Sequence, residues 1–259
     1  MSSNYQPIIE IIEEDYEIPQ LKRRRRIAAL LPYNYAESEK KYPVLYLHDG
    51  QNLFDENSPY GNWAVDQSLG RLAEHGYGDI VVISIDHGGE DRINEYMPFN
   101  TSYGPGQGKL YIRFLMETLK PYVDKKYRVL TDGTHTGIGG SSMGGLISLY
   151  AGLTFPAIFS RMMIFSPSLW LSPKIYQLAR KFILPFNQEG LVSSHLYLYA
   201  GGRESQAHLT NVIRFGADLL TNLEEGLRFK FSHNPDGVHH ESDWRKEFPV
   251  ALKWLYFEQ

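Results

Sequence analysis

Short apolar runs alternate with longer amphipathic segments along most of the chain, and this alternation predicts strands and helices in turn. Runs such as YPVLYLH and DIVVISID are apolar at almost every position, as expected for strands that are buried on both faces of a sheet. We predict strands over residues 42–48, 79–86, 134–140, 161–166, 195–201 and 227–232.

The amphipathic segments between these runs have the spacing of helices. In the longest of them, over 109–127, apolar side chains recur every three or four residues. We predict helices over residues 64–76, 109–127, 143–155, 204–226 and 242–258, the last of them bent or restarted at Pro249.

Strands that alternate with helices in this way indicate a mainly parallel sheet with helices on both faces. The sequence therefore predicts an α/β fold, a three-layer sandwich. The segment before residue 42 is expected to add one or two antiparallel strands at the edge of the sheet. A chain of 259 residues is compatible with one domain over 1–259.

Composition excludes several classes of function. The net charge of −4 gives no basic field for nucleic acid, and the absence of cysteine excludes disulfides, thiolate catalysis and cysteine-bound metals. The basic run Lys22–Arg26 is interpreted as a solvated edge strand whose charges deter sheet pairing.

Neither a membrane span nor a secretory signal is expected. No apolar segment has the length of a transmembrane helix, so we expect no membrane partner. The first residues lack a basic stretch, and Glu10 interrupts their only apolar run, so the given chain is expected to be cytoplasmic.

A glycine-rich turn between a predicted strand and a predicted helix carries the most specific chemical signal. Residues Gly140-Ser141-Ser142-Met143-Gly144 match the pattern G-x-S-x-G, the nucleophile elbow. Small neighbours let the strand and helix close around a serine at a strained apex. Ser142 is the predicted nucleophile, because Ser141 lacks the second glycine of the pattern.

Two backbone N–H groups are predicted to form an oxyanion hole beside this serine. One belongs to Met143, directly after the nucleophile. The other is expected in the loop after strand 42–48, where Gly50 permits a tight turn and the N–H of Gln51 is aimed at the cleft. His48, in the same segment, competes for the role of base by position alone, but a buried role is favoured for it.

A base and an acid should follow the serine, in the order serine, acid, histidine. His195 and His208 are interpreted as structural, and His233 ends the last strand. His239 and His240 occupy the loop between the last strand and the last helix, where the base belongs.

The acid is predicted to follow strand 195–201. Glu204 lies there, just past two glycines, and the alternative for it is a helix N-terminal carboxylate. Asp236 and Asp243 are the other candidate acids, and both lie close in sequence to the histidines. Spacing alone leaves the choice between His239 and His240 open.

Five segments together resemble the putative-esterase group of the α/β-hydrolases, which includes esterase D-like, enterochelin-esterase-like, feruloyl and acetylxylan esterases. They are YPVLYLHDGQNLFD, GSSMGGLISLY, SPSLW, GGRES and HHESDW…FPVALKWLY, and the resemblance extends from about residue 8 to the C-terminus. It implies an α/β-hydrolase fold with Ser142, Glu204 and His239 as catalytic residues. His239 falls on the family's pattern His-x-Glu-x-x-Trp.

The resemblance also implies the surroundings of the site. The DGQN turn matches the family's oxyanion loop in position. The residues that it implies near the substrate cleft are Asn52, Arg92, Glu95, Tyr96 and Trp170.

The predicted function is a serine carboxylic-ester hydrolase that acts through an acyl-enzyme on a small-molecule ester. No cluster of histidines and acids shows ligand spacing in the sequence, so neither a metal nor a cofactor is expected. Two alternatives are an acyltransferase that uses the same residues and a non-catalytic binding domain on the same fold.

Overall fold

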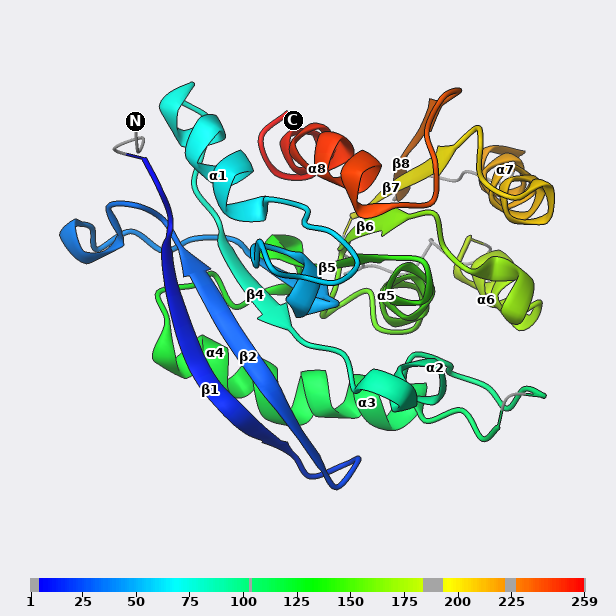
Figure 1. The fold of residues 1–259 in the computed structure, drawn as a ribbon, viewed down its shortest axis with the longest axis horizontal. Coiled ribbons are helices and arrows are strands. Elements are labelled where there is room, and N and C mark those ends of the chain that lie inside the picture. Colours follow the sequence, from blue (N-terminus) through cyan, green and yellow to red (C-terminus); the bar gives the residue numbers. More distant parts are fainter. Residues whose placement is uncertain (1–4, 103, 184–192, 222–226, 259) are drawn as a thin grey trace.

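An eight-stranded sheet forms the centre of the fold, in the order β1-β2-β4-β3-β5-β6-β7-β8 (Figure 1). The computed structural model describes residues 5–102, 104–183, 193–221 and 227–258. The strands are β1 (Ile8–Ile18), β2 (Arg23–Leu31), β3 (Val44–His48), β4 (Val81–Ile85), β5 (Thr136–Ser141), β6 (Arg161–Phe165), β7 (Ser194–Gly201) and β8 (Leu227–Asn234). The six strands from β4 to β8 in the sheet are parallel, and β1 and β2 are antiparallel. The predicted α/β fold with antiparallel N-terminal strands is confirmed.

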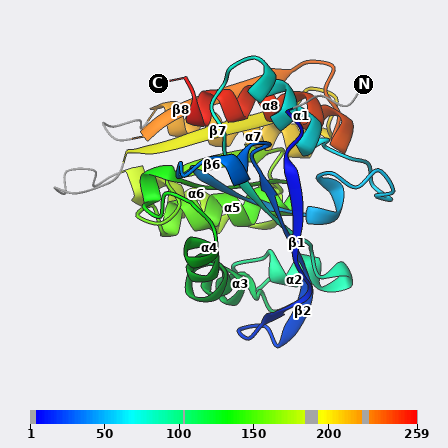
Figure 2. The ribbon, with the colours of Figure 1, turned by 90° about the vertical axis from the view of Figure 1, so that its left-hand side faces the viewer.

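Helices cover both faces of the sheet. They are α1 (Val65–Glu74), α2 (Arg92–Glu95), α3 (Gly108–Phe114), α4 (Lys120–Lys126), α5 (Met143–Thr154), α6 (Lys174–Ile183), α7 (Gln206–Thr221) and α8 (Glu241–Tyr256). In Figure 2, α1 and α8 lie on one side of the sheet, and α3 and α4 lie on the other.

The alternation of side chains along each central strand divides the core into two clusters. In β3, Val44 and Tyr46 belong to the cluster that includes side chains of α3 to α7, whereas Leu45 and Leu47 belong to the cluster that includes those of α1 and α8. All five residues of β3 are buried, which is why this strand has no polar face in the sequence.

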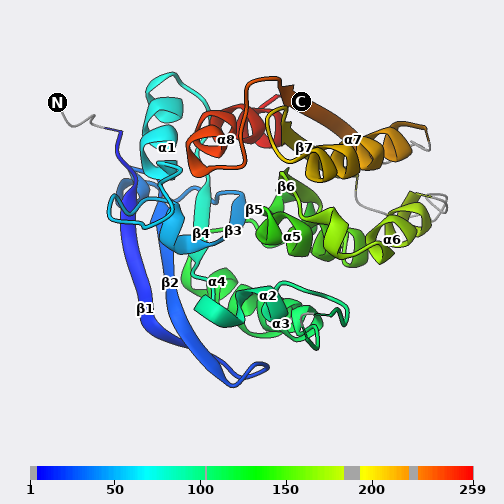
Figure 3. The same ribbon diagram turned by 45° about the vertical axis from the view of Figure 1, so that its right-hand side comes forward.

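The interpretation of the basic run as an edge strand is wrong. Residues 23–26 begin β2, which lies between β1 and β4, so the edge strand of the sheet is β1. Arg25 is buried and forms an ion pair with Glu95 of α2, and Arg26 pairs with Asp86. Only Lys22 and Arg24 of the run are exposed. Figure 3 shows β1 and β2 running along one side of the molecule towards α3.

The helices differ from the prediction in three places. The helix predicted over 109–127 contains a π-helical segment, Leu115–Leu119, which ends two residues before Pro121, a residue with no N–H to donate. The helix α8 continues through Pro249, so a restart there is not observed. No helix was predicted where α6 and the short α2 lie. Residues 222–226 of the predicted helix 204–226 fall outside the described residues.

Loops at the carboxyl ends of β3, β5, β6, β7 and β8 meet at one edge of the parallel sheet, where α/β proteins bind ligands. Most residues of the candidate site described next come from these loops or from the helices that follow them, and the others come from the end of β3 and from the loop and helix after β4. Within the described ranges, no helix combines the length and the apolar character that a bilayer crossing requires.

Candidate active site

Ser142 lies at the sharp turn from β5 to α5. Its backbone has φ 55° and ψ −117°, a conformation that side-chain-bearing residues rarely adopt. The turn closes because glycines lie two residues before and two residues after Ser142: a Cβ on Gly140 would lie 2.9 Å from the carbonyl carbon of Gly144. A Cβ on Gly144 would lie 2.9 Å from Oδ2 of Asp49, in the loop after β3. The sequence pattern of the elbow is therefore a packing requirement.

Glu204 lies in the turn between β7 and α7, and its side chain has no exposed surface. Oε1 accepts hydrogen bonds from Oγ of Ser166 (2.5 Å) and the N–H of Gly201 (2.8 Å). Oε2 accepts one from Nδ1 of His239 (3.0 Å). Burial by itself would raise the pKa of Glu204, but these hydrogen bonds outweigh it and lower the pKa below its usual value. Glu204 is thus held as a carboxylate at neutral pH.

His239 lies in the loop between β8 and α8, with 34% of its side chain exposed. Trp244 packs edge-on against the ring, with centroids 5.0 Å apart, and its Nε1 donates to Oγ of Ser166. No hydrogen bond joins His239 to Ser142 among the described residues. Oγ of Ser142 instead lies 3.2 Å from Oγ of Ser168, and Ser142 and His239 line the same hollow.

The structure separates the two neighbouring histidines. His239 contacts Glu204, whereas His240 is the N-cap of α8 and its Nδ1 accepts a hydrogen bond from the N–H of Ser242. Of the other candidate acids, Asp236 is exposed and Asp243 accepts from the N–H of Val238 and pairs with Lys246.

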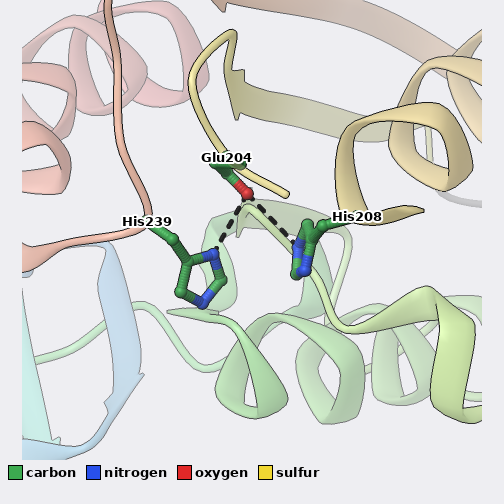
Figure 4. A group of neighbouring side chains, drawn as sticks. All are labelled: Glu204, His208 and His239. Atoms are coloured by element: carbon green, nitrogen blue, oxygen red, sulfur yellow. Dashed lines mark hydrogen bonds and ion pairs between the residues drawn. The ribbon is translucent and has the colours of Figure 1, made fainter. Parts of the chain in front are cut away.

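His208, which the sequence analysis treated as structural, lies beside the other two residues. Figure 4 shows Glu204 between His239 and His208, with dashed lines to both. Nε2 of His208 lies 2.8 Å from the carbonyl oxygen of Ser166 and 3.4 Å from Oε2 of Glu204. Burial lowers the pKa of His208, which favours a neutral ring that donates Nε2–H to that carbonyl. This contact joins α7 to the end of β6, a long-range feature that sequence spacing does not reveal.

Glu204, His208 and His239 also have ligand atoms within 4.8 Å of one another, a spacing compatible with a metal ion. The statement that the chain has no such cluster is therefore wrong. However, the facing nitrogens of both rings and both carboxylate oxygens already have hydrogen-bond partners. We interpret the cluster as an acid–base site.

The two backbone N–H groups predicted to form the oxyanion hole, those of Gln51 and Met143, donate to no acceptor within the described part of the chain. The loop that carries Gln51 is held on both sides: its side-chain amide exchanges two hydrogen bonds with the backbone of His87, and Arg92 forms a bidentate pair with Asp49 (2.6 and 2.8 Å). Asp49 itself is in the left-handed conformation, with φ 60°. This loop is thus fixed before any ligand arrives.

The residues expected near the substrate divide into two groups. Asn52 and Arg92 line the hollow that contains Ser142, and Nδ2 of Asn52 donates to Glu241 at the start of α8. Glu95 and Tyr96 are fully buried below it. Glu95 forms ion pairs with Arg23 and Arg25. The side chains of Glu95 and Tyr96 therefore support the cleft and do not line it.

Two hollows meet at His239. The larger has a volume of about 740 Å³ and includes Ser142, Arg92 and Glu241. The smaller, of about 510 Å³, is lined by Trp170, Ser205, Ala207, His208 and His239. The side chain expected at the pocket wall, Trp170, therefore lies in the second hollow.

His48 has a structural place. It is buried, Nδ1 lies 2.9 Å from the hydroxyl of Tyr111, and it lines neither hollow. Burial lowers its pKa from 6.5 to about 4.

We expect this histidine to make the folded state sensitive to acid. The unfolded chain takes up a proton near pH 6.5 and the folded protein only near pH 4, so stability is complete above pH 6.5 and is lost as the pH falls towards 4. The free energy of unfolding should fall by about 3 kcal/mol, because each unit of difference between the two pKa values contributes about 1.4 kcal/mol. Urea denaturation at pH 7.5 and pH 4.5 measures it. His48→Gln should reduce the difference between the two pH values, and an unchanged difference would contradict this assignment.

Comparisons with known proteins identify the family and the fold of the chain. The family described as "Putative esterase" matches residues 18–255. The uncharacterized protein YbbA of Bacillus subtilis (strain 168) is 27% identical over 247 residues, covering 90% of this chain and 92% of its own. The ferri-bacillibactin esterase BesA of the same organism is 25% identical over 212 residues, covering 73% and 71%.

A solved structure supports the fold over the whole chain. The BES protein from Bacillus cereus superimposes with a TM-score of 0.81 at 20% sequence identity, covering 99% of this chain and 96% of that one. The fold and the family together define an α/β-hydrolase-type carboxylic ester hydrolase. The chain belongs to the "Putative esterase" family, as its sequence motifs predicted.

Proposed function

We propose that the protein is a serine carboxylic-ester hydrolase with Ser142 as nucleophile, His239 as base and Glu204 as the acid that orients the base. The observation that supports this most strongly is the 3.0 Å contact between Glu204 and Nδ1 of His239, beside a serine in the strained elbow conformation. The contact leaves Nε2 of His239 as the nitrogen available to the serine.

In the first step, Nε2 takes the hydroxyl proton of Ser142 while Oγ forms a bond to the ester carbonyl carbon. Oγ first exchanges its contact with Ser168 for one with His239, a rotation about one side-chain bond. The carbonyl oxygen becomes negative and accepts from the N–H groups of Gln51 and Met143.

In the second step, the bond between carbon and the alcohol oxygen breaks, and that oxygen takes the proton from His239. Water then attacks the acyl-serine, giving its proton to His239, and the acid leaves as Ser142 regains the proton. Arg92 keeps the oxyanion loop in place through Asp49, and Asn52 joins that loop to the histidine loop through Glu241.

The direct test is the hydrolysis of a panel of aryl and alkyl esters by the purified protein, with product analysis. We expect one acid and one alcohol per turnover, and a kcat/KM that 5 mM EDTA leaves unchanged, because each potential ligand atom already serves a hydrogen bond. Loss of activity in EDTA that zinc restores would contradict the acid–base assignment.

Added acceptor alcohols separate the hydrolase from the acyltransferase. A hydrolase should release free acid as the main product even when a primary alcohol is present. If most of the acyl group is transferred to the alcohol at millimolar concentration, the acyltransferase is the better description.

A further inference from the structure

The second hollow is built differently from the one that contains Ser142. One of its lining residues is Trp170, which follows β6 and has 48% of its surface exposed. Trp170 is two residues after Ser168, the residue whose hydroxyl contacts Ser142. An exposed indole in a hollow that also contains His239 offers a large apolar contact area to a ligand.

The charge of the two hollows also differs. The larger one carries Glu90, Arg92 and Glu241 in its wall. The wall of the smaller one, as far as the structure describes it, holds no carboxylate, lysine or arginine, and most of its surface is apolar. Burial lowers the pKa of His208, which favours its uncharged form. An uncharged, flat group suits this second hollow, whereas a charged group would lose water there without gaining a partner.

The position of each hollow relative to the reacting atoms assigns the two halves of an ester. Ser142 lines only the larger hollow, and His239 lines both. The acyl carbon must reach Ser142 and the oxyanion N–H groups, while the alcohol oxygen must reach Nε2 of His239 to take its proton. The hollow that touches the base and not the nucleophile therefore lies beside the leaving alcohol.

We propose that the hollow at Trp170 is the alcohol subsite of the enzyme, and that it selects esters of uncharged aromatic or bulky alkyl alcohols, the acyl group occupying the larger hollow. This proposal rests on the proposed serine-esterase function. It implies that Trp170 acts on acylation and not on deacylation, because the alcohol has already left the acyl-enzyme when water attacks.

The experiment compares Trp170→Ala with the wild-type protein on two ester series. One series keeps a butyryl group and changes the alcohol from methyl to benzyl to naphthyl. The other keeps a methyl alcohol and changes the acyl group from acetyl to butyryl to benzoyl. For each ester, the kcat/KM of the wild type is divided by that of the variant, so the intrinsic reactivity of the ester cancels. Tyr60→Ala is the matched control, since Tyr60 is an exposed aromatic residue (61%) in the larger hollow.

We expect Trp170→Ala to lower kcat/KM on the order of 10-fold for the naphthyl ester and less than about 2-fold for the methyl ester, with the deacylation rate unchanged. Trp170→Phe should restore most of the loss. For Tyr60→Ala, the change in kcat/KM should not depend on the alcohol of the ester. An equal loss for all alcohols, or a loss that follows the acyl group, would overturn the alcohol subsite while leaving the esterase intact. Absence of any ester hydrolysis that depends on Ser142 would overturn the proposed function as well.

Discussion

Ser142→Ala is expected to lower kcat/KM for a reactive aryl ester by about 10³-fold or more, leaving a residual rate from the oxyanion N–H groups. Alanine keeps the Cβ, so it meets the same backbone conformation of φ 55° as the serine. The fold should therefore be unchanged, which the thermal unfolding midpoint and the circular dichroism spectrum measure. Steady-state kinetics on the same ester give the size of the loss.

Ser141→Ala is the matched control for this variant. Ser141 is the last residue of β5 and is 4% exposed, and it lacks the strained conformation of its neighbour. We expect it to keep most of the activity. Equal losses from both substitutions, or a Ser142→Ala protein that remains active, would contradict the assignment of the nucleophile.

His239→Ala should lower kcat/KM by about as much as Ser142→Ala does, because the members of a triad act as one unit. The imidazole must accept a proton at Nε2 while Glu204 holds Nδ1, and no other ring in the described structure combines a contact to Glu204 with a place in the hollow of Ser142. Glu204→Gln should have an intermediate effect, since the amide keeps the size of the carboxylate and loses its charge. Kinetics at neutral pH, with a folding control for each variant, measure these losses.

His240→Ala provides the comparison. It removes the N-cap of α8, so we expect a modest loss of stability and a much smaller loss of activity. If His240→Ala abolishes turnover and His239→Ala remains active, the assignment of the base is off by one residue.

The parallel part of the sheet could be predicted because its strands are buried on both faces, and strands of this kind are apolar at almost every position in the sequence. The position of β2 could not, because a run of arginines looks solvated unless its partners are known. Arg25 is buried because Glu95, 70 residues away in the chain, neutralises it. The elbow could be predicted because its glycines and its serine lie within five consecutive residues, so the pattern depends on no distant partner.

The remainder of the site depends on long-range contacts. Ser166 donates to Glu204 from the residue after β6, the strand that pairs with β7, and His208 contacts the backbone of Ser166 from α7. Single-sequence spacing carries no signal for such pairs. Glu95 and Tyr96 were expected near the cleft from their motif, but both are fully buried and neither lines a hollow.

The most direct test of the central proposal is to identify the residue that a fluorophosphonate probe modifies. The probe reacts covalently with an activated serine, and peptide mass spectrometry locates the adduct. We expect one adduct per chain, on Ser142, formed rapidly by the wild-type and His240→Ala proteins, slowly by His239→Ala and not by Ser142→Ala. An adduct on Ser141 or Ser168, or a wild-type protein that does not react, would contradict the account.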